Sequence, residues 1–437
     1  MRGRQWLVAF AVTAVVVGLA SSATMASARQ TSASAAVAPK FQLRLGTIMP
    51  FTGSLSAVGP SINAGGELAV NTINQTLASM GLSGQISVDI VDALDDQTAT
   101  APAVEDATKE VKIDKVDEII GTLSSTSTIA VATSVTIPSG TLLISPTASS
   151  PALTNLKAGL GPTRSVYRML PSDNFQGAAL AEAAELAFGK GATVNVGARD
   201  DDFGTALQAV FVKTWEAMGG KVGAQVNWDP NGTTFDTEAQ KLVSGNPKGW
   251  VIIDYPETFA KVGPALVRTG KWSPAKTLMT DVMSIPASLQ QVGKQATVGL
   301  RGTAPSSLAP SNPQVAAFAK LFKTTESKFP VTGYEGTSFD AVVASFLAAL
   351  EAGSASPKAI ESKLEAVTDP GPGKTVVTYL NLKQAIKLIL AGKQIKYQGV
   401  FGPIDFDAHG DVGSAVYRYW KYNGNVVSTL KLFNYGG

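Results

Sequence analysis

The 437-residue sequence has no cysteine and only one histidine. Because cysteine is absent, we expect no disulfide, no thiol catalysis, no thiolate metal site and no lipid attached through a cysteine. The histidine, His409, lies in the polar turn Asp407-Ala-His-Gly410, where a surface role is favoured over catalysis. With so few nitrogen and sulfur ligands, we expect neither a metal site nor a cofactor.

Charged residues are also scarce, at 16% of the chain, and they are balanced. The sequence has 36 basic and 34 acidic residues, and the first 28 residues hold two of the arginines and no acid. A protein that binds nucleic acid needs a basic face, so we expect no nucleic-acid partner. Hydrophobic residues make up 45%, enough for a sizeable core in two or three domains.

The N-terminus has the pattern of an export signal. Arg2 and Arg4 precede an apolar run from Trp6 to Ala20, and the small residues Ala-Ser-Ala end at Ala28. This pattern predicts a signal peptide over residues 1–28. A membrane anchor is the alternative, although the run is shorter than the roughly 20 apolar residues of a spanning helix. We therefore expect the protein to be periplasmic or extracellular, after a flexible leader that ends at residue 40.

Motifs of known enzyme classes are missing. No Gly-x-Ser-x-Gly elbow occurs, and Gly373-Lys-Thr375 lacks the upstream glycine of a phosphate loop, since Thr368 stands there. The acids Asp92, Asp95 and Asp96 lack calcium-loop spacing and favour helix capping instead. We do not expect an enzyme, although a secreted enzyme that uses an acid pair stays an alternative.

Short apolar strands alternate with helices from Phe41 to Asp281, which indicates parallel sheets covered by helices. About ten such units are too many for one sheet, so we expect two lobes. Paired glycines, Gly65 and Gly66, are expected to let one helix pack closely on a sheet. The expected strands are 43–49, 86–91, 118–123, 141–145, 166–170, 193–198, 222–227, 250–255 and 277–281; helices follow near 313–328, 337–352 and 380–391, and strands from 397 to 433.

Two hydroxyl-rich segments are expected at the ligand-binding edge of the first sheet. Residues Gly121–Thr128 join a strand to a helix, and ligands of open α/β sheets bind beyond the carboxyl ends of strands. A helix start offers free N–H groups and a partial positive charge, which suits a carboxylate. Plain capping of the helix by serine is the alternative. The next strand ends in Ile144–Ser149, which would place Thr147 beside the first segment.

Motifs spread over the chain resemble those of a known transport family. They are Gly46-Thr-Ile-Met-Pro-Phe-Thr-Gly53, Gly66-Glu-Leu-Ala-Val-Asn-Thr-Ile-Asn74, Ser124-Ser125, Ile144–Thr154, Tyr167-Arg-Met-Leu-Pro-Ser-Asp173, Asp201-Asp-Phe-Gly204, Ser338-Phe-Asp-Ala341 and Gly402–Gly410. Their order is similar to that of the branched-chain amino acid type of ABC transporter substrate-binding protein, the leucine/isoleucine/valine-binding protein family. That family has the type I periplasmic binding protein fold.

The resemblance implies an α/β fold of two Rossmann-like lobes with parallel sheets, joined by three hinge crossings. We expect the crossings near Arg164, Leu300 and Gly402. In such proteins the ligand binds between the lobes, which close on it. The implied division is a signal peptide at 1–28, a leader at 29–40, lobe 1 at 41–164 plus 300–401, and lobe 2 at 165–299 plus 402–437.

The resemblance also implies roles for residues of the first lobe. Ser125 and Ser149 match hydroxyl positions that hold the α-carboxylate of the ligand, with Ser124 close by. Thr147 matches a residue whose backbone carbonyl accepts a hydrogen bond from the α-ammonium group.

In the second lobe, Asp281 matches the acidic residue that pairs with the ligand's ammonium group, and helix capping is the alternative. Phe203 and Tyr255 match aromatic positions that cover the ligand, with core packing as the alternative. Phe203 stands where tyrosine is common in the family, and Asp281 is shorter than the glutamate of some members. Together with the loop Ser54–Val58, the aromatic residues suggest an apolar or uncharged side chain on the ligand.

The implied function is capture of an amino acid or a similar small carboxylate and its delivery to an ABC permease in the membrane, by a protein that is a monomer. A ligand sensor of the same fold, without transport, is the alternative, because fold alone does not decide function.

Overall fold

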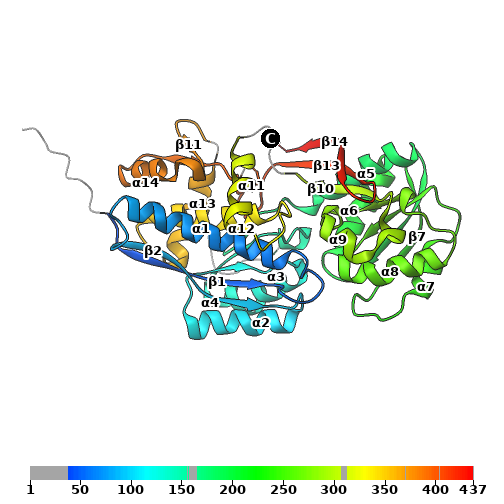
Figure 1. Ribbon diagram of the computed structural model, residues 1–437, viewed down its shortest axis with the longest axis horizontal. Coiled ribbons are helices and arrows are strands. Elements are labelled where there is room, and N and C mark those ends of the chain that lie inside the picture. The colour runs from blue at the N-terminus through cyan, green and yellow to red at the C-terminus, as the bar shows by residue number, and fades with distance from the viewer. Residues whose placement is uncertain are drawn as a thin grey trace, which may run out of the picture. The chain divides into compact units, whose positions relative to one another are not determined.

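The computed structural model describes residues 38–154, 156, 165–306, 313–369, 371–402 and 404–436. A five-stranded parallel sheet has the order β2-β1-β3-β4-β5, and its strands β3, β4 and β5 are buried on both faces (Figure 1). Continuous apolar runs are typical of such strands, because helices cover both faces of a parallel sheet. The strands are β1 (Phe41–Met49), β2 (Ile86–Asp95), β3 (Glu118–Gly121), β4 (Leu142–Ser145) and β5 (Val166–Arg168).

A second sheet has seven strands in the order β14-β13-β10-β9-β8-β6-β7. Its first five strands along the chain are parallel, and the C-terminal hairpin of β13 and β14 adds an antiparallel edge. The strands are β6 (Thr193–Arg199), β7 (Lys221–Trp228), β8 (Gly249–Ile253), β9 (Thr277–Met279), β10 (Arg301–Pro305), β13 (Ala415–Tyr422) and β14 (Val427–Tyr435). A small parallel pair is formed by β11 (Thr375–Val377) and β12 (Ile395–Tyr397).

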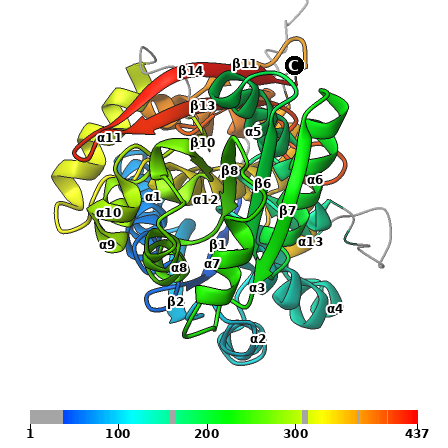
Figure 2. The ribbon, with the colours of Figure 1, turned by 90° about the vertical axis from the view of Figure 1, so that its right-hand side faces the viewer.

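Helices cover both sheets. In the first lobe, α1 and α12 lie on one face of the sheet and α2 on the other (Figure 1). In the second lobe, α5 and α6 lie on one side of the strands, with α8 and α9 on the other (Figure 2). The bounds are α1 (Gly59–Ser79), α2 (Thr100–Lys109), α3 (Ser125–Val131), α4 (Ile137–Ser139), α5 (Asp173–Phe188), α6 (Gly204–Ala217), α7 (Asp236–Leu242), α8 (Pro256–Arg268), α9 (Pro286–Val292), α10 (Lys294–Thr297), α11 (Pro313–Thr325), α12 (Glu335–Ala352), α13 (Pro357–Thr368) and α14 (Leu382–Leu390).

All nine strands expected before residue 300 are present, so the α/β fold class is confirmed. Helix α13 and the β11–β12 pair were not expected. The glycines of α1 also have a different partner. A Cβ on Gly65 would lie 2.1 Å from the backbone oxygen of Glu335, so α1 packs closely on α12 rather than on the sheet.

The chain passes between the sheets three times: after β5, after β10 and between β12 and β13. Strand β5 thus extends the first sheet and β10 the second. The exact lobe boundaries stay a prediction, and the expected signal peptide, most of the leader and Arg164 lie outside the described residues. In the described part of the chain, no single helix is long and apolar enough to span a membrane, and only α12 and α13 together, bent by 106°, meet those criteria.

Candidate functional site

Loops from both lobes enclose a small cavity of about 30 Å³. The loops follow the carboxyl ends of β1, β3 and β4 in one lobe, and of β6, β8 and β9 in the other. This is the edge at which open α/β sheets bind ligands. The cavity is lined by Leu55, Val58, Ile62, Leu123, Thr147, Phe203, Tyr255, Asp281, Val282, Ile285 and Tyr334.

Four of the seven predicted site residues line this cavity: Thr147, Phe203, Tyr255 and Asp281. They follow the ends of four different strands, β4, β6, β8 and β9, in two lobes, so the fold brings together residues that are far apart in the sequence. The hydroxyl of Thr147 donates to the backbone carbonyl of Leu123 at 3.0 Å, which fixes the loop after β4 against the loop after β3.

The aromatic side of the cavity is a stack. The rings of Phe203 and Tyr255 lie 5.1 Å apart at 16°. The guanidinium of Arg199 lies 3.8 Å from the centre of the Tyr255 ring, a cation–π distance. Arg199 is itself held by Asp201, with Nε 2.5 Å from Oδ2. Sequence reasoning missed Arg199. Its position at the end of a strand, just before the Asp201–Gly204 motif, was a signal that it lies at the ligand-binding edge of the sheet.

Asp281 supplies the charge of the cavity. It is 7% exposed, and its Oδ1 has no hydrogen-bond partner among the described residues. Burial raises the pKa of the carboxyl to about 6. The residue precedes a 3₁₀ turn, but its side chain does not cap that turn. An unpaired carboxylate oxygen in a cavity is free to accept a hydrogen bond from a ligand.

Two further polar side chains belong to this region and were not predicted. Asp173, the first residue of α5, is buried; burial, then the charge of Asp281, raises its pKa to about 8. Its Oδ2 accepts a hydrogen bond from the hydroxyl of Ser149 at 3.0 Å. Tyr334 lines the cavity with a buried hydroxyl that has no partner among the described residues. Nothing local in the sequence marks Tyr334 as a cavity residue.

The three predicted serines do not line the small cavity. Ser124 caps α3, since its hydroxyl accepts from the N–H of Ser127 at 3.2 Å. The hydroxyl of Ser125 accepts from the N–H groups of Ser149 and Ser150, at 3.2 and 3.1 Å. The two hydroxyl-rich segments therefore lie side by side, as the sequence predicts.

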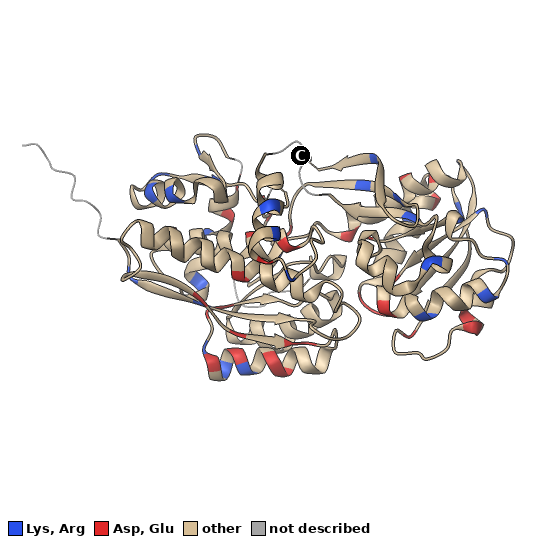
Figure 3. Cartoon of the chain, viewed as in Figure 1, with Lys and Arg blue, Asp and Glu red and all other residues tan. Residues whose placement is uncertain are grey.

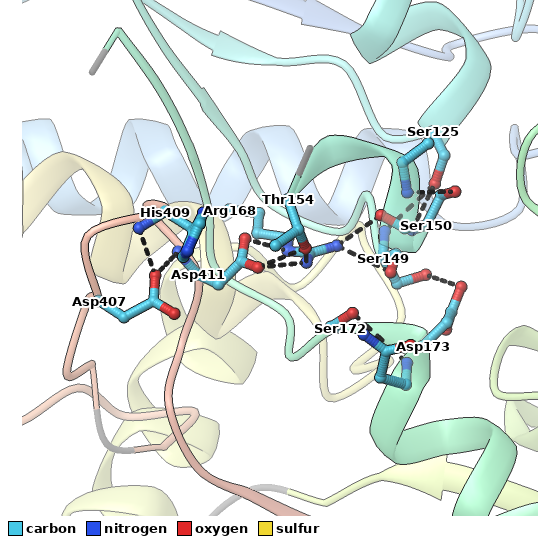
Figure 4. A network of polar contacts seen from close by, with 12 residues as sticks. Ser125, Ser149, Ser150, Thr154, Arg168, Ser172, Asp173, Asp407, His409 and Asp411 are labelled. Atoms are coloured by element: carbon cyan, nitrogen blue, oxygen red, sulfur yellow. Dashed lines mark hydrogen bonds and ion pairs between the residues drawn. The ribbon is translucent and has the colours of Figure 1, made fainter. Parts of the chain in front are cut away.

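A buried arginine fixes this serine loop, as Figure 4 shows. Arg168 on β5 is 2% exposed, and its Nε and Nη2 donate to the carboxylate of Asp411 at 2.8 and 2.7 Å. Its Nη1 donates to the backbone carbonyls of Ser149 and Ser150, both at 2.8 Å. One side chain thus connects β5, the loop after β4 and the third crossing between the sheets. His409, two residues before Asp411, is exposed as expected.

Hydrogen bonds also join the two lobes directly. The N–H of Asp202 donates to the hydroxyl of Thr126 at 3.1 Å, and Ser150 donates its hydroxyl to the carbonyl of Asp202 at 2.8 Å. On the other side, the hydroxyl of Ser54 donates to Glu257 at 2.9 Å. Hydroxyl groups of the first lobe therefore hold loops of the second.

A larger cavity, of about 460 Å³, lies between loops of both lobes. Its walls are polar, with Ser124 and Thr126 on one lobe and Arg199 and Glu257 on the other. Among the described residues, no group of three or more His, Cys, Asp or Glu side chains could hold a metal ion.

The sequence and the fold are similar to those of known proteins. Residues 42–396 match the family described as periplasmic binding protein. The substrate-binding protein BasB of a chemotactic signal transduction system in Halobacterium salinarum is 24% identical over 374 residues, which cover 83% of each chain.

Two solved structures share the fold. The leucine-binding protein LivK from Thermotoga maritima has a TM-score of 0.72 at 22% identity, over 90% of this chain and 98% of that chain. A solute-binding protein of an ABC transporter from R. palustris, in complex with benzoate, has a TM-score of 0.69 at 19% identity. The match covers 90% of this chain and 96% of that chain. Because the family match spans most of the sequence and the two-lobed fold agrees with it, the chain belongs to the periplasmic binding protein family, in its type I form.

Proposed function

We propose that the protein binds an amino acid or a related small carboxylate between its lobes and delivers it to an ABC permease. The observation that carries the ligand class is the unpaired oxygen of Asp281, which is buried at the cavity. A buried carboxylate oxygen without a partner is costly, and a ligand's ammonium group would offset that cost.

In the proposed complex, the ammonium group binds Asp281 and the backbone carbonyl of Thr147. The carboxylate binds at the start of α3, near Ser124, Ser125 and Ser149. The described hydrogen bonds of Ser125 use its oxygen as an acceptor only, so its proton is available to a ligand carboxylate. Ser124 and Ser125 keep their contacts as acceptors in this arrangement, whereas Ser149 would turn its hydroxyl proton from Asp173 to the ligand carboxylate.

The rest of the cavity supports an apolar ligand side chain. Leu55, Val58 and Ile62 line it from the first lobe, and Ile285 with the Phe203–Tyr255 stack from the second. Ligand pockets of this kind combine an apolar lining with a few polar groups that fix orientation. Leucine, isoleucine and valine are therefore the first ligands to test, followed by benzoate.

Binding requires the lobes to move apart. A cavity of about 30 Å³ has room for about one water molecule, less than any amino acid needs. The loops would open to admit the ligand and close over it, as hinged two-domain proteins do. The interlobe hydrogen bonds of Asp202 would break and re-form in each cycle.

A thermal-shift screen followed by calorimetry tests the proposal. A ligand at about 100 times its Kd adds about 2.7 kcal/mol to the free energy of unfolding, a clear rise in Tm. We expect leucine, isoleucine or valine to give this rise. If no amino acid and no small carboxylate raises the Tm, the ligand class is wrong.

The variant Asp281→Asn keeps the size of the side chain and removes the charge. We expect it to weaken amino acid binding at least 100-fold, since charge pairs in closed sites are worth several kcal/mol. Asp236→Asn, an exposed change at the start of α7 that lines neither cavity, is the matched control and should bind as the unchanged protein does. Equal affinity in Asp281→Asn would place the ammonium group elsewhere.

A sensory role without transport is the second candidate, because the relative from H. salinarum belongs to a chemotactic system. Pull-downs from membranes with the ligand-loaded protein separate the two roles. Recovery of a permease and its ATPase supports delivery, whereas recovery of a receptor without a permease supports sensing. In either role the protein holds its ligand and does not transform it.

A further inference from the structure

One segment of the first lobe departs from the charge balance of the chain. From Gly371 to Ile404 the sequence has five lysines and no acidic residue or arginine. The whole chain, by contrast, has 36 basic and 34 acidic residues. The segment contains β11, α14 and β12, which form an extension beside α12 and α13.

Three of the five lysines of the extension are exposed. Helix α14 buries Leu382, Ile386 and Ile389 against the lobe, which leaves the opposite side of the helix in solvent. Lys383 and Lys387 are exposed on α14. That helix carries basic residues and no acidic one (Figure 3).

Lys393 is exposed in the turn after α14, and none of these three lysines has an ion-pair partner among the described residues. The fifth lysine of the segment, Lys374, is excluded from this set. Its Nζ donates to the carbonyl of Ala366 at 2.6 Å and contacts Asp369 at 3.1 Å.

Apolar side chains lie next to the unpaired lysines. Leu380 is 57% exposed in the 3₁₀ turn Tyr379–Asn381, which directly precedes α14, and it lies three residues before Lys383. Val376 is 54% exposed and pairs in register with the half-exposed Lys396 on β12. These two apolar side chains would lie within reach of a surface that the lysines contact.

We propose that this surface, the lysine face, docks on a bilayer that contains anionic phospholipids. The lysine face consists of Lys383, Lys387, Lys393 and Lys396 with Leu380 and Val376. A cluster of four lysines attracts an anionic lipid surface, and exposed apolar side chains can enter the headgroup region. Docking of this kind would hold the protein near membrane partners and does not depend on the ligand.

The composition of the face favours lipid over an acidic protein. Protein interfaces are enriched in arginine and aromatic residues and depleted of lysine, whereas every cation here is lysine. Lysine acts as a flexible point charge and does not need the fixed geometry of a protein partner. Lipid phosphate groups in a fluid bilayer can pair with such flexible charges without a fixed geometry.

Sedimentation with vesicles tests the proposal on the chain without its first 28 residues. We expect binding to vesicles of phosphatidylcholine with about 30% phosphatidylglycerol, and none to pure phosphatidylcholine. Raising the salt from about 0.05 M to about 0.5 M should release the protein, since it screens exposed charges. The bound fraction should be the same with and without leucine.

The triple variant Lys383→Gln, Lys387→Gln and Lys393→Gln should reduce the bound fraction at least about fivefold. A matched control, Lys213→Gln, Lys241→Gln and Lys248→Gln, removes the same charge from exposed positions of the second lobe and should bind normally. Both variants should keep the Tm of the unchanged protein, because all six side chains are exposed. An equal loss in both variants, or no binding to anionic vesicles, would overturn the proposal.

Discussion

Ser150 donates its hydroxyl proton to the backbone carbonyl of Asp202 at 2.8 Å, and so ties the loop after β4 in the first lobe to the loop after β6 in the second. The N–H of Asp202 donates to the hydroxyl of Thr126, so the two peptide groups that flank the Cα of Asp202 are both held by the first lobe. The closed arrangement of the cleft therefore depends on neutral hydrogen bonds that no ligand needs to supply.

The double variant Thr126→Val and Ser150→Ala should weaken ligand binding without changing ligand contacts. Each hydrogen bond contributes about 1 kcal/mol, so losing two should raise the Kd about thirtyfold. The dissociation rate should account for most of the change, because the closed state loses the two hydrogen bonds that join its lobes at Asp202. Surface plasmon resonance measures both.

Thr133→Val is the control for this pair. The hydroxyl of Thr133 donates only within its own helical segment, to the carbonyls of Ile129 and Ala130, and it is exposed. Binding in that variant should be unchanged. A double variant that binds as tightly as the unchanged protein would mean that the Asp202 contacts do not hold the closed state.

Amino acid binding should weaken at acidic pH. The ligand's ammonium group needs an ionised Asp281, and burial raises the pKa of that carboxyl to about 6. As the pH falls below that value, Asp281 takes up a proton and the Kd should rise about tenfold per pH unit. At higher pH the carboxyl is ionised and the Kd should level off. Calorimetry between about pH 4.5 and pH 8 follows the change.

Asp281→Asn removes the charge and should remove this pH dependence as well as the affinity. The second buried acid, Asp173, has its pKa raised to about 8 by burial and then by Asp281, and its proton would be released at higher pH. Asp173→Asn should therefore keep the rise in Kd below about pH 6. Loss of that rise in Asp173→Asn alone would assign the effect to Asp173.

The ion pair of Arg168 and Asp411 should matter far more for folding than an exposed one. Asp411→Ala leaves a buried guanidinium with carbonyl partners but no counter-charge, which costs about 3–5 kcal/mol of unfolding free energy. Asp236→Ala breaks a pair with Arg268 in which both side chains are more than half exposed, and should cost less than about 1 kcal/mol. Urea unfolding compares the two, and equal losses would contradict this account.

Much of the fold could be predicted because its strands are short apolar runs between polar turns. The same local signal was present for α13, where Ile360, Leu364 and Val367 have helical spacing after Ser356 and Pro357. It was missed because the Pro- and Gly-rich stretch that follows it indicates a loop. The strand pair β11–β12 has only three residues in each strand, too few for a periodic pattern.

The candidate site was predicted in part. Resemblance gave Thr147, Phe203, Tyr255 and Asp281, and the fold places all four at one cavity. Residues whose role depends on partners distant in the sequence could not be found that way. Arg168 and Asp411 are 243 positions apart, and neither segment carries a local sign of the other.

The close packing of α1 on α12 gives a last prediction. A methyl group on Gly65 would lie 2.1 Å from the backbone oxygen of Glu335, which cannot move aside as a flexible side chain can. Gly65→Ala should therefore lower the free energy of unfolding by about 1–3 kcal/mol, in spite of alanine's better helix propensity. Gly84→Ala adds the same methyl group where no atom lies within 4 Å, and the Tm should not fall. Equal Tm values for both variants would mean that the helices separate without cost.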